Sequence, residues 1–443
     1  MRISVIGCGY LGAVHAAAMA ELGHEVVGID RDPLKIDTLA KGEAPFFEPG
    51  LTELLERGIA AGLLSFSTDI EAARGASVHF IAVGTPQRPD GSADLSAVHA
   101  SLRSVIGVLT PGDLIVGKST VPVGTAQMLQ PEAEHAGGSL AWNPAFLREG
   151  FAVRDSLEPD RIVYGVAPGD TRSAETLDRV YSPILSAGTP RMVTDLATAE
   201  LVKVAANAFL ATKISFINAM AEIAEVVGAD VTQLADAIGH DARIGRRFLN
   251  AGIGFGGGCL PKDIRGFIAR ADELGVGHSL NFLREVDQIN LRRRDRVVEL
   301  TREALEGRLR GRRIAVLGLA FKPDSDDVRD SPALDVARRL HAEGAIVVAT
   351  DPEAIETARP IAPQLDYRVP LHEAVLDAEV VLVLTEWPQY RELDPVAMAR
   401  LAAPSAVVVD GRLCLDADRW RAAGWRYRAP GRLTDRSREL LAV

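Results

Sequence analysis

The sequence predicts an α/β protein built from two doubly wound domains that a long central helix joins. Short apolar runs alternate with longer amphipathic stretches from the first residue, which is the pattern of parallel strands connected by helices. A long segment without glycine or proline interrupts this pattern, which then returns. A chain of 443 residues is also longer than one hydrophobic core usually organises. We therefore expect three parts, at residues 1–195, 196–305 and 306–443.

The first part is predicted to hold a parallel sheet with both faces covered. Its candidate strands are short runs rich in valine, isoleucine and leucine, bounded by turn residues. They are Ile3–Gly7, Glu25–Ile29, Val78–Val83, Leu114–Lys118, Leu140–Trp142 and Arg161–Val166.

The middle part is predicted to be helical. The segment from Leu196 to the residue before Gly228 has helical spacing of apolar residues and no helix breaker, so we expect one long helix. A further glycine-punctuated helical region continues to about residue 310. Strands then return in the last part, at Arg313–Leu317, Ile346–Thr350, Val380–Leu384 and Ala406–Asp410.

The two α/β parts contain a faint internal repeat. "RISVIG" ends at Gly7 and is followed by "VVGIDRDP", while "RIAVLG" ends at Gly318 and is followed by "VVATDPE". The second turn carries an insertion of about ten residues relative to the first. We expect the two parts to share a fold but not a ligand.

Composition narrows the class of protein. There are 49 Lys and Arg against 60 Asp and Glu, for a net charge of −11, which argues against a nucleic acid or an acidic membrane as the partner. Three cysteines, Cys8, Cys259 and Cys414, form no disulfide framework and suit a reducing compartment. No uninterrupted apolar run approaches the roughly 20 residues that span a bilayer, and the first residues lack signal-peptide architecture. We expect a soluble, cytoplasmic protein without a metal site.

A glycine motif after the first strand predicts dinucleotide binding. In "GCGYLG", Gly7 permits a tight turn, Gly9 leaves room for a pyrophosphate, and Gly12 lets the next helix pack close to the strand. The helix N-terminus at Tyr10 and Leu11 supplies backbone N–H groups for phosphate. Asp30 ends the following strand, where it suits ribose hydroxyls and favours NAD, although the adjacent Arg31 leaves NADP open. This motif predicts a Rossmann-like fold for the first α/β part, and the internal repeat extends the prediction to the second.

The segment "GIGFGGGCLPKD" predicts a nucleophilic cysteine. Three consecutive glycines before Cys259 disfavour regular structure, so close approach of the backbone to a ligand would explain them. A thiol becomes a competent nucleophile near a base or a cation, and Lys262 and Asp263 follow closely. The alternative is a buried apolar cysteine beside a flexible turn.

Two further polar groups have weaker local signals. Lys203 and Asn207 lie four residues apart on the long helix and therefore share a face, where they could stabilise an oxyanion. Alternatively, they are one solvated lysine and one helix-interior asparagine. Thr120 in "GKSTVPVGT" follows a strand, at the sheet edge where ligands bind in such folds, or it is simply part of a turn. In the second repeat, Gly318 lacks the glycine motif, so Lys322 would have to hold any pyrophosphate.

Taken together, these segments resemble the UDP-glucose 6-dehydrogenases within the UDP-glucose/GDP-mannose dehydrogenase family. The resemblance covers nearly the whole chain, in order and spacing: "GCGYLG", "VGTP", "KSTVPVGT", "NPAFLREG", "ELVKVAANAF", "RIG", "GFGGGCLPKD", "GLAFKPDSDDVRDSP" and "DGRL". It implies an N-terminal NAD-binding domain, a long central helix at the core of a homodimer, and a C-terminal domain that binds the nucleotide of UDP-glucose.

The resemblance also implies a reaction. UDP-glucose is oxidised by four electrons to UDP-glucuronate with two NAD+, through a thiohemiacetal and a thioester on Cys259. Lys203 and Asn207 match residues that polarise the reacting oxygen, and Asp263 and Thr120 match residues that hold a water for proton transfer. Further positions match cofactor contacts, namely Lys35, Thr85, Thr120, Glu149 and Lys262. The matched substrate contacts are Phe146, Leu147, Glu149, Lys203, Asn207, Phe248, Asn250, Gly256, Phe321, Lys322 and Arg412, with Arg243 supplied by the partner subunit.

One residue departs from the family pattern. The family usually has "NPEFL", whereas this chain has Ala145 in place of the glutamate, and alanine cannot accept a proton. We expect slowed hydrolysis of the thioester. Three other functions stay open: the same chemistry on GDP-mannose or UDP-N-acetylmannosamine, a non-catalytic nucleotide-sugar-binding protein, and a single-step hydroxyacid-type dehydrogenase.

Overall fold

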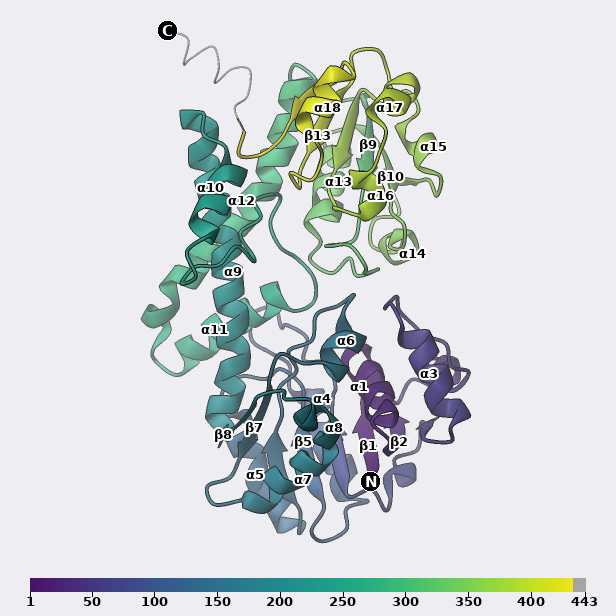
Figure 1. Cartoon of the computed structure of the whole chain (residues 1–443), viewed down its shortest axis with the longest axis vertical. Helices are drawn as coiled ribbons and strands as arrows, with labels where there is room; N and C mark the ends of the chain where they lie inside the picture. The colour runs from purple at the N-terminus through teal and green to yellow at the C-terminus, as the bar shows by residue number, and fades with distance from the viewer. Residues whose placement is uncertain (433–443) are drawn as a thin grey trace. The chain divides into compact units, whose positions relative to one another are not determined.

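The structure is a computed structural model that describes residues 1–432 in two compact units (Figure 1). The first unit comprises Met1–Ala206 with Arg265–Gly277, and the second comprises Asn207–Ile264 with residues 278–432. All three boundaries between the units fall inside helical segments, and each unit combines two separate stretches of the sequence. The three-part division at residues 195 and 305 stays a prediction.

The first unit is organised around an eight-stranded sheet in the order β3-β2-β1-β4-β5-β6-β7-β8. Pairing is parallel from β3 to β6 and between β7 and β8, whereas β7 runs antiparallel to β6. The strands are β1 (Arg2–Ile6), β2 (Glu25–Ile29), β3 (Leu64–Ser67), β4 (Val78–Ile81), β5 (Leu114–Gly117), β6 (Ser139–Trp142), β7 (Ile162–Val166) and β8 (Arg191–Asp195).

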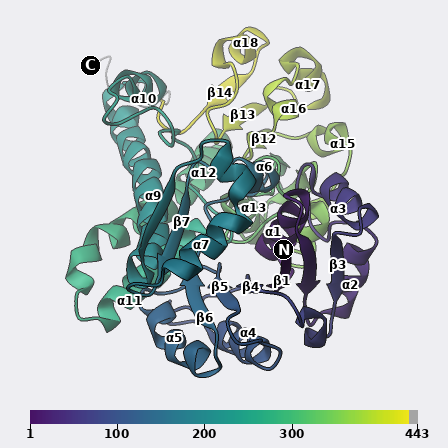
Figure 2. The same ribbon diagram turned by 60° about the horizontal axis from the view of Figure 1, so that its bottom comes forward.

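Helices cover both faces of this sheet, with two separate clusters of buried apolar residues between the layers. In Figure 2, α1 and α7 lie on one side of the strands and α4 and α5 on the other. The helical elements are α1 (Tyr10–Glu21), α2 (Pro33–Ala40), α3 (Leu51–Ala60), η1 (Ile70–Ala73), α4 (Ser96–Ile106), α5 (Thr125–His135), α6 (Ala152–Leu157), α7 (Thr171–Val180) and α8 (Ser182–Ser186).

The strands predicted for this part are confirmed, but the sequence missed two. β3 has one fully buried residue and β8 has none, so neither shows the continuous apolar run of a strand buried on both faces. These two strands lie at the edges of the sheet, where the demand for apolar side chains is smallest.

The long central helix is confirmed as α9 (Leu196–Val227). Within residues 1–432, α9 is the one helix long and apolar enough to cross a membrane, a test that the core helix of a soluble protein also passes. The other helices of this region are α10 (Val231–Gly239), α11 (Leu260–Glu273), η2 (Gly277–Leu280) and α12 (Asn281–Ala304).

The second unit contains a six-stranded parallel sheet in the order β11-β10-β9-β12-β13-β14. Its four predicted strands are confirmed, and β11 and β14 are short additions at the edges. Its strands are β9 (Arg313–Leu317), β10 (Ile346–Thr350), β11 (Asp366–Tyr367), β12 (Val380–Val383), β13 (Val407–Asp410) and β14 (Arg426–Arg428). Its helices are α13 (Pro332–Ala342), α14 (Ile355–Ala358), α15 (Leu371–Val375), α16 (Pro388–Arg391), α17 (Pro395–Leu401) and α18 (Ala417–Ala422).

The internal repeat is confirmed at the level of single hydrogen bonds. The strand order of the second sheet repeats that of the first six strands of the first sheet. Cys8 N–H donates to Asp30 Oδ2 at 2.8 Å, and Leu319 N–H donates to Asp351 Oδ2 at 2.7 Å. Carboxylates at corresponding positions of the repeat, Asp30 and Asp351, therefore fix the turn after the first strand of each sheet.

The two carboxylates differ in the number of hydrogen bonds that they accept from the protein. Asp351 is buried and accepts further hydrogen bonds from the backbone of Ala320, Glu353 and Ala354 and from Trp387 Nε1. Donors from the protein thus surround both of its oxygens. Asp351 serves the fold, which is consistent with the expectation that the two sheets do not share a ligand.

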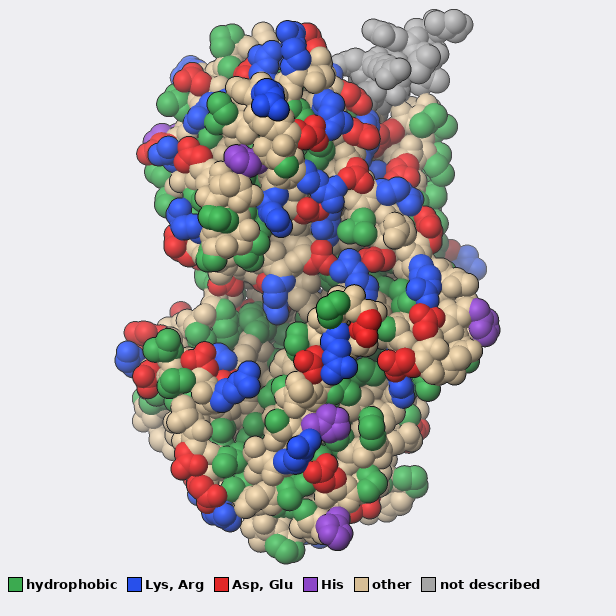
Figure 3. Space-filling view, turned by 180° about the vertical axis from the view of Figure 1, so that it is seen from behind, with side chains coloured by type: hydrophobic (Ala, Val, Ile, Leu, Met, Phe, Trp, Pro, Cys, Tyr) green, Lys and Arg blue, Asp and Glu red, His purple; other side chains and the backbone are tan. Residues whose placement is uncertain are grey.

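The outer surface mixes both signs of charge. On the face in Figure 3, Lys and Arg side chains are interspersed with Asp and Glu side chains, and no broad area of one sign is visible. Any bound phosphate on this face would therefore depend on a few local donors.

The role of Asp351 can be tested by Asp351→Asn. The amide keeps the size of the side chain, but its Nδ2 would face backbone N–H donors, so we expect a loss of about 1–3 kcal/mol in unfolding free energy. The measurement is urea denaturation followed by circular dichroism. As a control, Asp366→Asn removes a carboxylate that pairs with Arg368 at the surface, and should change stability by less than about 0.5 kcal/mol. Equal stability of the two variants would contradict this role.

Candidate active site

The glycine loop between β1 and α1 has the geometry that the motif predicts. Gly7 has φ of +91°, and a Cβ atom at Gly12 would lie 1.7 Å from the carbonyl oxygen of Gly7. A Cβ atom at Gly9 would meet nothing within 4 Å, so the loop leaves open space at the start of α1. In the part of the chain that the structure describes, no side chain caps this helix end. Its first N–H groups can therefore bind a phosphate.

Asp30 lies beside this loop at the end of β2. Its carboxylate accepts hydrogen bonds from Cys8 N–H and from Lys35 Nζ, the latter at 2.9 Å. Burial alone would raise the pKa of Asp30, but the hydrogen bonds from Lys35, Asp32 and Cys8 outweigh it and lower the pKa. The structure thus brings together the glycine loop, Asp30 and Lys35.

The tyrosine of the motif has a structural partner that the sequence did not reveal. The Tyr10 hydroxyl donates to the carboxylate of Glu48, and burial together with this bond raises the pKa of Tyr10. Glu48 is buried and accepts hydrogen bonds from Gly150 N–H and Ala152 N–H, each at 2.6 Å. It therefore caps α6 and ties the 143–150 segment to α1. Leu11 packs against the apolar core on this side of the sheet.

The carboxyl ends of β4 and β5 lie together, as expected for neighbouring parallel strands. The Thr85 hydroxyl donates to the carbonyl oxygen of Thr120 at 2.7 Å, and the Ser119 hydroxyl donates to that of Val83 at 2.7 Å. These bonds join the turns after the two strands. Thr85 and Thr120 are thus two predicted site residues that the structure brings into contact.

Two buried or half-buried side chains hold the rest of the "KSTVPVGT" turn. Glu200 of α9 accepts hydrogen bonds from Gly124 N–H at 2.6 Å and from Ala126 N–H at 2.7 Å, and so caps α5. Arg270 of α11 donates to the carbonyl oxygen of Val123 at 2.9 Å. Neither residue was predicted, because a single Glu or Arg on a helix carries no local signal of such a role.

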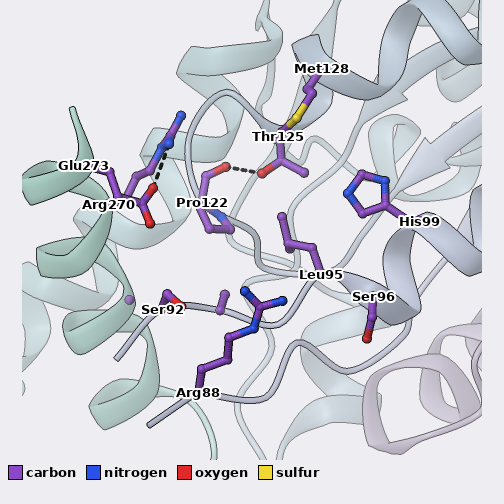
Figure 4. A pocket seen from close by; sticks show the side chains of 12 residues that line it. Arg88, Ser92, Leu95, Ser96, His99, Pro122, Thr125, Met128, Arg270 and Glu273 are labelled. Carbon is purple, nitrogen blue, oxygen red and sulfur yellow. Dashed lines mark hydrogen bonds and ion pairs between the residues drawn. The ribbon is translucent and has the colours of Figure 1, made fainter. Parts of the chain in front are cut away.

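A pocket of about 380 Å³ lies behind this turn, within the first unit. Figure 4 shows Arg270 paired with Glu273, and the Thr125 hydroxyl directed at the carbonyl oxygen of Pro122, at 2.5 Å. None of the predicted site residues lines this pocket. Its lining includes Arg88, Ser92, Leu95, Ser96, His99 and Met128.

The 143–150 segment leaves β6 and carries several predicted residues. Phe146 packs against the apolar core, and its ring lies 5.8 Å from Lys203 Nζ and 4.0 Å from the Arg161 guanidinium. Glu149 is buried, and Leu147 is half-buried against the other core cluster. Ala145 is half-buried, so this position is open to solvent in part.

The three cysteines have different surroundings. Burial raises the pKa of the Cys8 thiol and of the Cys414 thiol, so neither is suited to form a thiolate. Cys259 is exposed, and its carbonyl oxygen accepts the hydrogen bond from Asp263 N–H that opens α11. It therefore occupies the N-cap of a helix of 14 residues, where the helix dipole stabilises negative charge.

Asp263 lies at the centre of a polar cluster. Its buried carboxylate accepts a hydrogen bond from Asn207 Nδ2 at 2.7 Å and one from Lys262 Nζ at 2.7 Å. The structure thus brings Asn207 of α9 onto the first turn of α11, directly after Cys259. Lys203 is buried one helical turn before Asn207 on α9.

The glycine-rich segment before Cys259 packs tightly inside the second unit. A Cβ atom at Gly256 would lie 2.4 Å from the carbonyl oxygen of Asp330. Gly257 has φ of +84°, and its Cβ atom would lie 2.8 Å from the ring of Phe321. The glycines are therefore required by packing against the protein itself, a reason that the sequence did not distinguish from contact with a ligand.

Buried side chains bind the backbone of this segment directly. Asn290 of α12 accepts from Phe255 N–H at 2.7 Å and donates to its carbonyl oxygen at 3.0 Å. Asn218 of α9 accepts from Gly252 N–H at 2.9 Å, and Arg293 donates to the Gly252 carbonyl oxygen at 3.1 Å. These three residues were also missed, because their partners are backbone groups far away in the sequence.

Arg412 connects this segment to the strand ends of the second sheet. It donates to the carbonyl oxygens of Leu384, Gly254 and Phe321 at 2.8, 3.0 and 2.9 Å, and it pairs with Glu386 at 3.2 Å. The structure thus brings together Arg412, Phe321 and the glycine-rich segment. Lys322 Nζ lies 5.5 Å from the Phe321 ring.

The segment after α10 holds the remaining predicted residues. Arg243 is exposed, and among residues 1–432 it pairs only with the nearby Asp241, at 2.6 Å. Phe248 adopts φ of +67°, and exposed Asn250 accepts a hydrogen bond from Arg246 at 2.7 Å. The exposed guanidinium of Arg243 is available to a group outside this chain.

Comparisons with known proteins agree with this arrangement. Residues 1–185, 197–292 and 315–417 match the NAD binding domain, the central domain and the UDP binding domain of one family, the UDP-glucose/GDP-mannose dehydrogenases. The UDP-glucose 6-dehydrogenase of Rhizobium meliloti (strain 1021) is 41% identical over 438 residues, covering 98% of this chain and 100% of that protein.

Two solved structures are similar over nearly the full length. A UDP-glucose dehydrogenase from Pyrobaculum islandicum has a TM-score of 0.88 and 42% identity, covering 97% of this chain and 98% of that one. A UDP-D-ManNAc dehydrogenase from Pyrococcus horikoshii has a TM-score of 0.85 and 27% identity, covering 98% and 99%. By its sequence matches and its fold, the chain belongs to the UDP-glucose/GDP-mannose dehydrogenase family.

Proposed function

We propose that this chain oxidises UDP-glucose to UDP-glucuronate, with NAD as the hydride acceptor and Cys259 as the nucleophile. The observation that carries the proposal is an exposed thiol at the N-terminus of α11, followed on the same helix by Asp263, which Asn207 and Lys262 hold. UDP-glucose is favoured because the similar UDP-glucose dehydrogenase structure is 42% identical and the UDP-D-ManNAc dehydrogenase structure is 27% identical.

The residues of the first glycine loop fit NAD. The open space at Gly9 and the uncapped start of α1 suit a pyrophosphate, and Asp30 suits ribose hydroxyls. A 2′-phosphate would meet the Asp30 carboxylate, so NAD is favoured over NADP. Bound NAD accepts a hydride from the carbon being oxidised. We assign Lys35, Thr85, Thr120, Glu149 and Lys262 to the same cofactor.

Each turnover removes four electrons as two hydrides and consumes one water. In the first half, the primary alcohol loses a proton and a hydride and becomes an aldehyde. Lys203 and Asn207 stabilise the negative charge on the reacting oxygen, since they share one face of α9. Asp263 and Thr120 hold the water that receives the proton.

In the second half, the Cys259 sulfur adds to the aldehyde carbon and forms a thiohemiacetal. Loss of the second hydride from that carbon, together with the proton of the thiohemiacetal hydroxyl, gives a thioester. Water then attacks the thioester carbon, the C–S bond breaks, and the carboxylate leaves while Cys259 regains its proton. This sequence requires one nucleophile that can form and release a covalent bond.

The substrate contacts divide between the nucleotide and the sugar. We assign Lys322 and Arg412 to the nucleotide diphosphate, beside Phe321. Phe146, Leu147, Glu149, Phe248, Asn250 and Gly256 complete the proposed set. The enzyme is proposed to act in the cytoplasm.

We also propose a homodimer formed through α9. Phe209, Phe216 and Ile223 recur every seventh residue on this helix and are 67%, 48% and 54% exposed. A row of exposed apolar side chains along a long helix is typical of an interface between subunits. The partner's copy of Arg243, exposed in one chain, is proposed to complete the substrate site.

The proposed function is tested by NADH release with a panel of nucleotide sugars. We expect UDP-glucose to give two NADH per sugar and to have a kcat/KM above those of GDP-mannose and UDP-N-acetylmannosamine. One NADH per sugar in solution, or preference for another sugar, would overturn the assignment.

Cys259→Ala should lower steady-state NADH formation by on the order of 10³-fold or more, because no thioester can form. NADH absorbance measures the rate. Cys414→Ala is the matched control, since its thiol is half-buried against Asp410, and this variant should stay within about twofold. Two NADH per UDP-glucose from Cys259→Ala would exclude the thioester route.

Ala145→Glu should speed turnover, because a carboxylate at this half-buried position can activate water for thioester hydrolysis. A general base contributes about 10²–10⁴-fold, so we expect a gain within this range in the hydrolytic step. Intact-protein mass spectrometry should detect an acyl adduct in the unmodified chain and less in Ala145→Glu. Ala145→Gln, of equal size, should gain nothing. Absence of an adduct together with equal rates would contradict this expectation.

Phe216→Asp should convert the dimer to a monomer, because burying a carboxylate in an apolar interface is costly. Analytical ultracentrifugation measures the mass, and kcat should fall in parallel if the partner's copy of Arg243 is needed. Phe282→Asp changes an equally exposed phenylalanine on α12 and should remain a dimer. A dimeric Phe216→Asp would place the interface elsewhere.

A further inference from the structure

Lys118 is a buried cation that the proposed chemistry does not use. It follows β5 directly, and only 8% of the residue is exposed. Its Nζ donates to Asn143 Oδ1 at 2.8 Å and to the Tyr181 hydroxyl at 3.3 Å, and it lies 5.8 Å from the ring centroids of Phe80 and Tyr181. Across residues 1–432, no carboxylate forms an ion pair with Lys118.

The groups around Lys118 are neutral. His15 of α1 is buried against the Phe80 ring, and its pKa is lowered first by burial and then by the charge of Lys118. Tyr181, between α7 and α8, has its pKa raised by burial. Asn143 follows β6 and carries no charge. Burial without a compensating anion lowers the pKa of Lys118 to about 7.

Such a residue costs stability. A buried ammonium without an anionic partner loses hydration that neutral hydrogen-bond acceptors replace only in part. A well-packed apolar side chain of similar length would avoid this cost. The fold alone therefore does not account for a lysine at this position.

Asn143 is the group through which Lys118 can act. Its Oδ1 accepts from Lys118 and also from the Tyr181 hydroxyl, at 2.6 Å, while its Nδ2 donates to the Val163 carbonyl oxygen at 2.9 Å. Its backbone N–H donates to the Gly117 carbonyl oxygen at 2.8 Å. Asn143 is thus fixed to β5, β7 and Tyr181 at the point where the 143–150 segment begins.

We propose that Lys118 is a positioning residue, which acts through Asn143 to hold the 143–150 segment in its binding arrangement. This inference rests on the proposed function, because it takes Phe146, Leu147 and Glu149 of that segment as substrate and cofactor contacts. Lys118 itself lies two residues before Thr120. Its hydrogen bond to Asn143 therefore links the turn that carries Thr120 to the 143–150 segment.

The test compares Lys118→Met with the unmodified full-length chain. Methionine fills a similar volume without charge, so we expect an equal or higher Tm at pH 6. We expect a rise of at least fivefold in KM for UDP-glucose and a smaller change in kcat. Hydrogen exchange of the peptide that covers residues 143–150 should become at least threefold faster. Lys41→Met, at an exposed lysine of the first unit, should change none of these.

The pH dependence of stability gives an independent readout. A lysine pKa near 7 in the folded state, below the ordinary value of 10.5, makes the unfolded chain bind more protons between these values. Stability conferred by this group therefore increases as pH rises from about 7 to 10.5, and the full penalty applies below pH 7. This contribution should be absent from the Tm–pH profile of Lys118→Met.

Two further variants test whether Lys118 acts through Asn143. Asn143→Ala should produce the same rise in KM, and the double variant Lys118→Met/Asn143→Ala should be no worse than either single one. Tyr181→Phe retains Lys118 and the ring but removes one donor to Asn143, and should speed exchange of the 143–150 peptide by a smaller factor. It also tests the network should Lys118→Met not fold.

The inference is overturned if Lys118→Met keeps KM within twofold and leaves exchange of residues 143–150 unchanged, or if the effects of the two single variants multiply. Failure of the proposed function is a separate result, because it appears in the unmodified chain as no NADH from UDP-glucose. Hydrogen exchange still tests Lys118 in that case, since it requires no substrate.

Discussion

Backbone N–H groups at the ends of buried strands need acceptors, and buried or half-buried carboxylates supply them throughout this protein. Asp30 binds the turn after β1, and Asp351 binds the corresponding turn after β9. Glu48 binds the start of α6, and Glu200 binds the start of α5. Because each carboxylate comes from a different element than the turn it binds, these bonds fix the loops at the edge of the sheet, where ligands bind in this fold.

The backbone of the segment that leads to Cys259 also needs hydrogen-bond partners, and it finds them in other side chains than carboxylates. It belongs to no strand, so its backbone lacks partners in a sheet. The amides of Asn218 and Asn290 and the guanidinium groups of Arg293 and Arg412 bind its N–H and carbonyl groups instead. Side chains at the glycines would collide with these partners or with their neighbours. The packing of the segment that leads to Cys259, the proposed nucleophile, therefore depends on the absence of side chains at its glycine positions.

The buried Lys118 is an exception to this pattern. Most buried polar groups here stabilise the fold by satisfying backbone groups, whereas Lys118 satisfies a side-chain oxygen at the cost of desolvating its own charge. Proteins commonly retain destabilising groups near functional sites, where geometry matters more than free energy of folding. The location of Lys118, between the turns that carry Thr120 and Phe146, agrees with that principle.

From the sequence alone we predicted the succession of strands and helices along the chain, the long helix and the dinucleotide loop, and Cys259 as the candidate nucleophile. These features depend on residues close together in sequence: periodic apolar runs, the spacing of Gly7, Gly9 and Gly12, and the glycines before Cys259. The edge strands β3 and β8 escaped prediction because they bury too few side chains.

The polar side chains that support the proposed site are identified by the folded structure and not by the local sequence. Glu48 contacts Gly150 across 102 residues, and Asn290 contacts Phe255 across 35. The folded structure also shows that Arg412 binds three carbonyl oxygens. It shows as well that Asp351, which corresponds to Asp30 in the internal repeat, binds backbone groups of its own domain. The physical reason is that a hydrogen bond depends on distance and burial in space, and local sequence carries information on neither until the strands are paired.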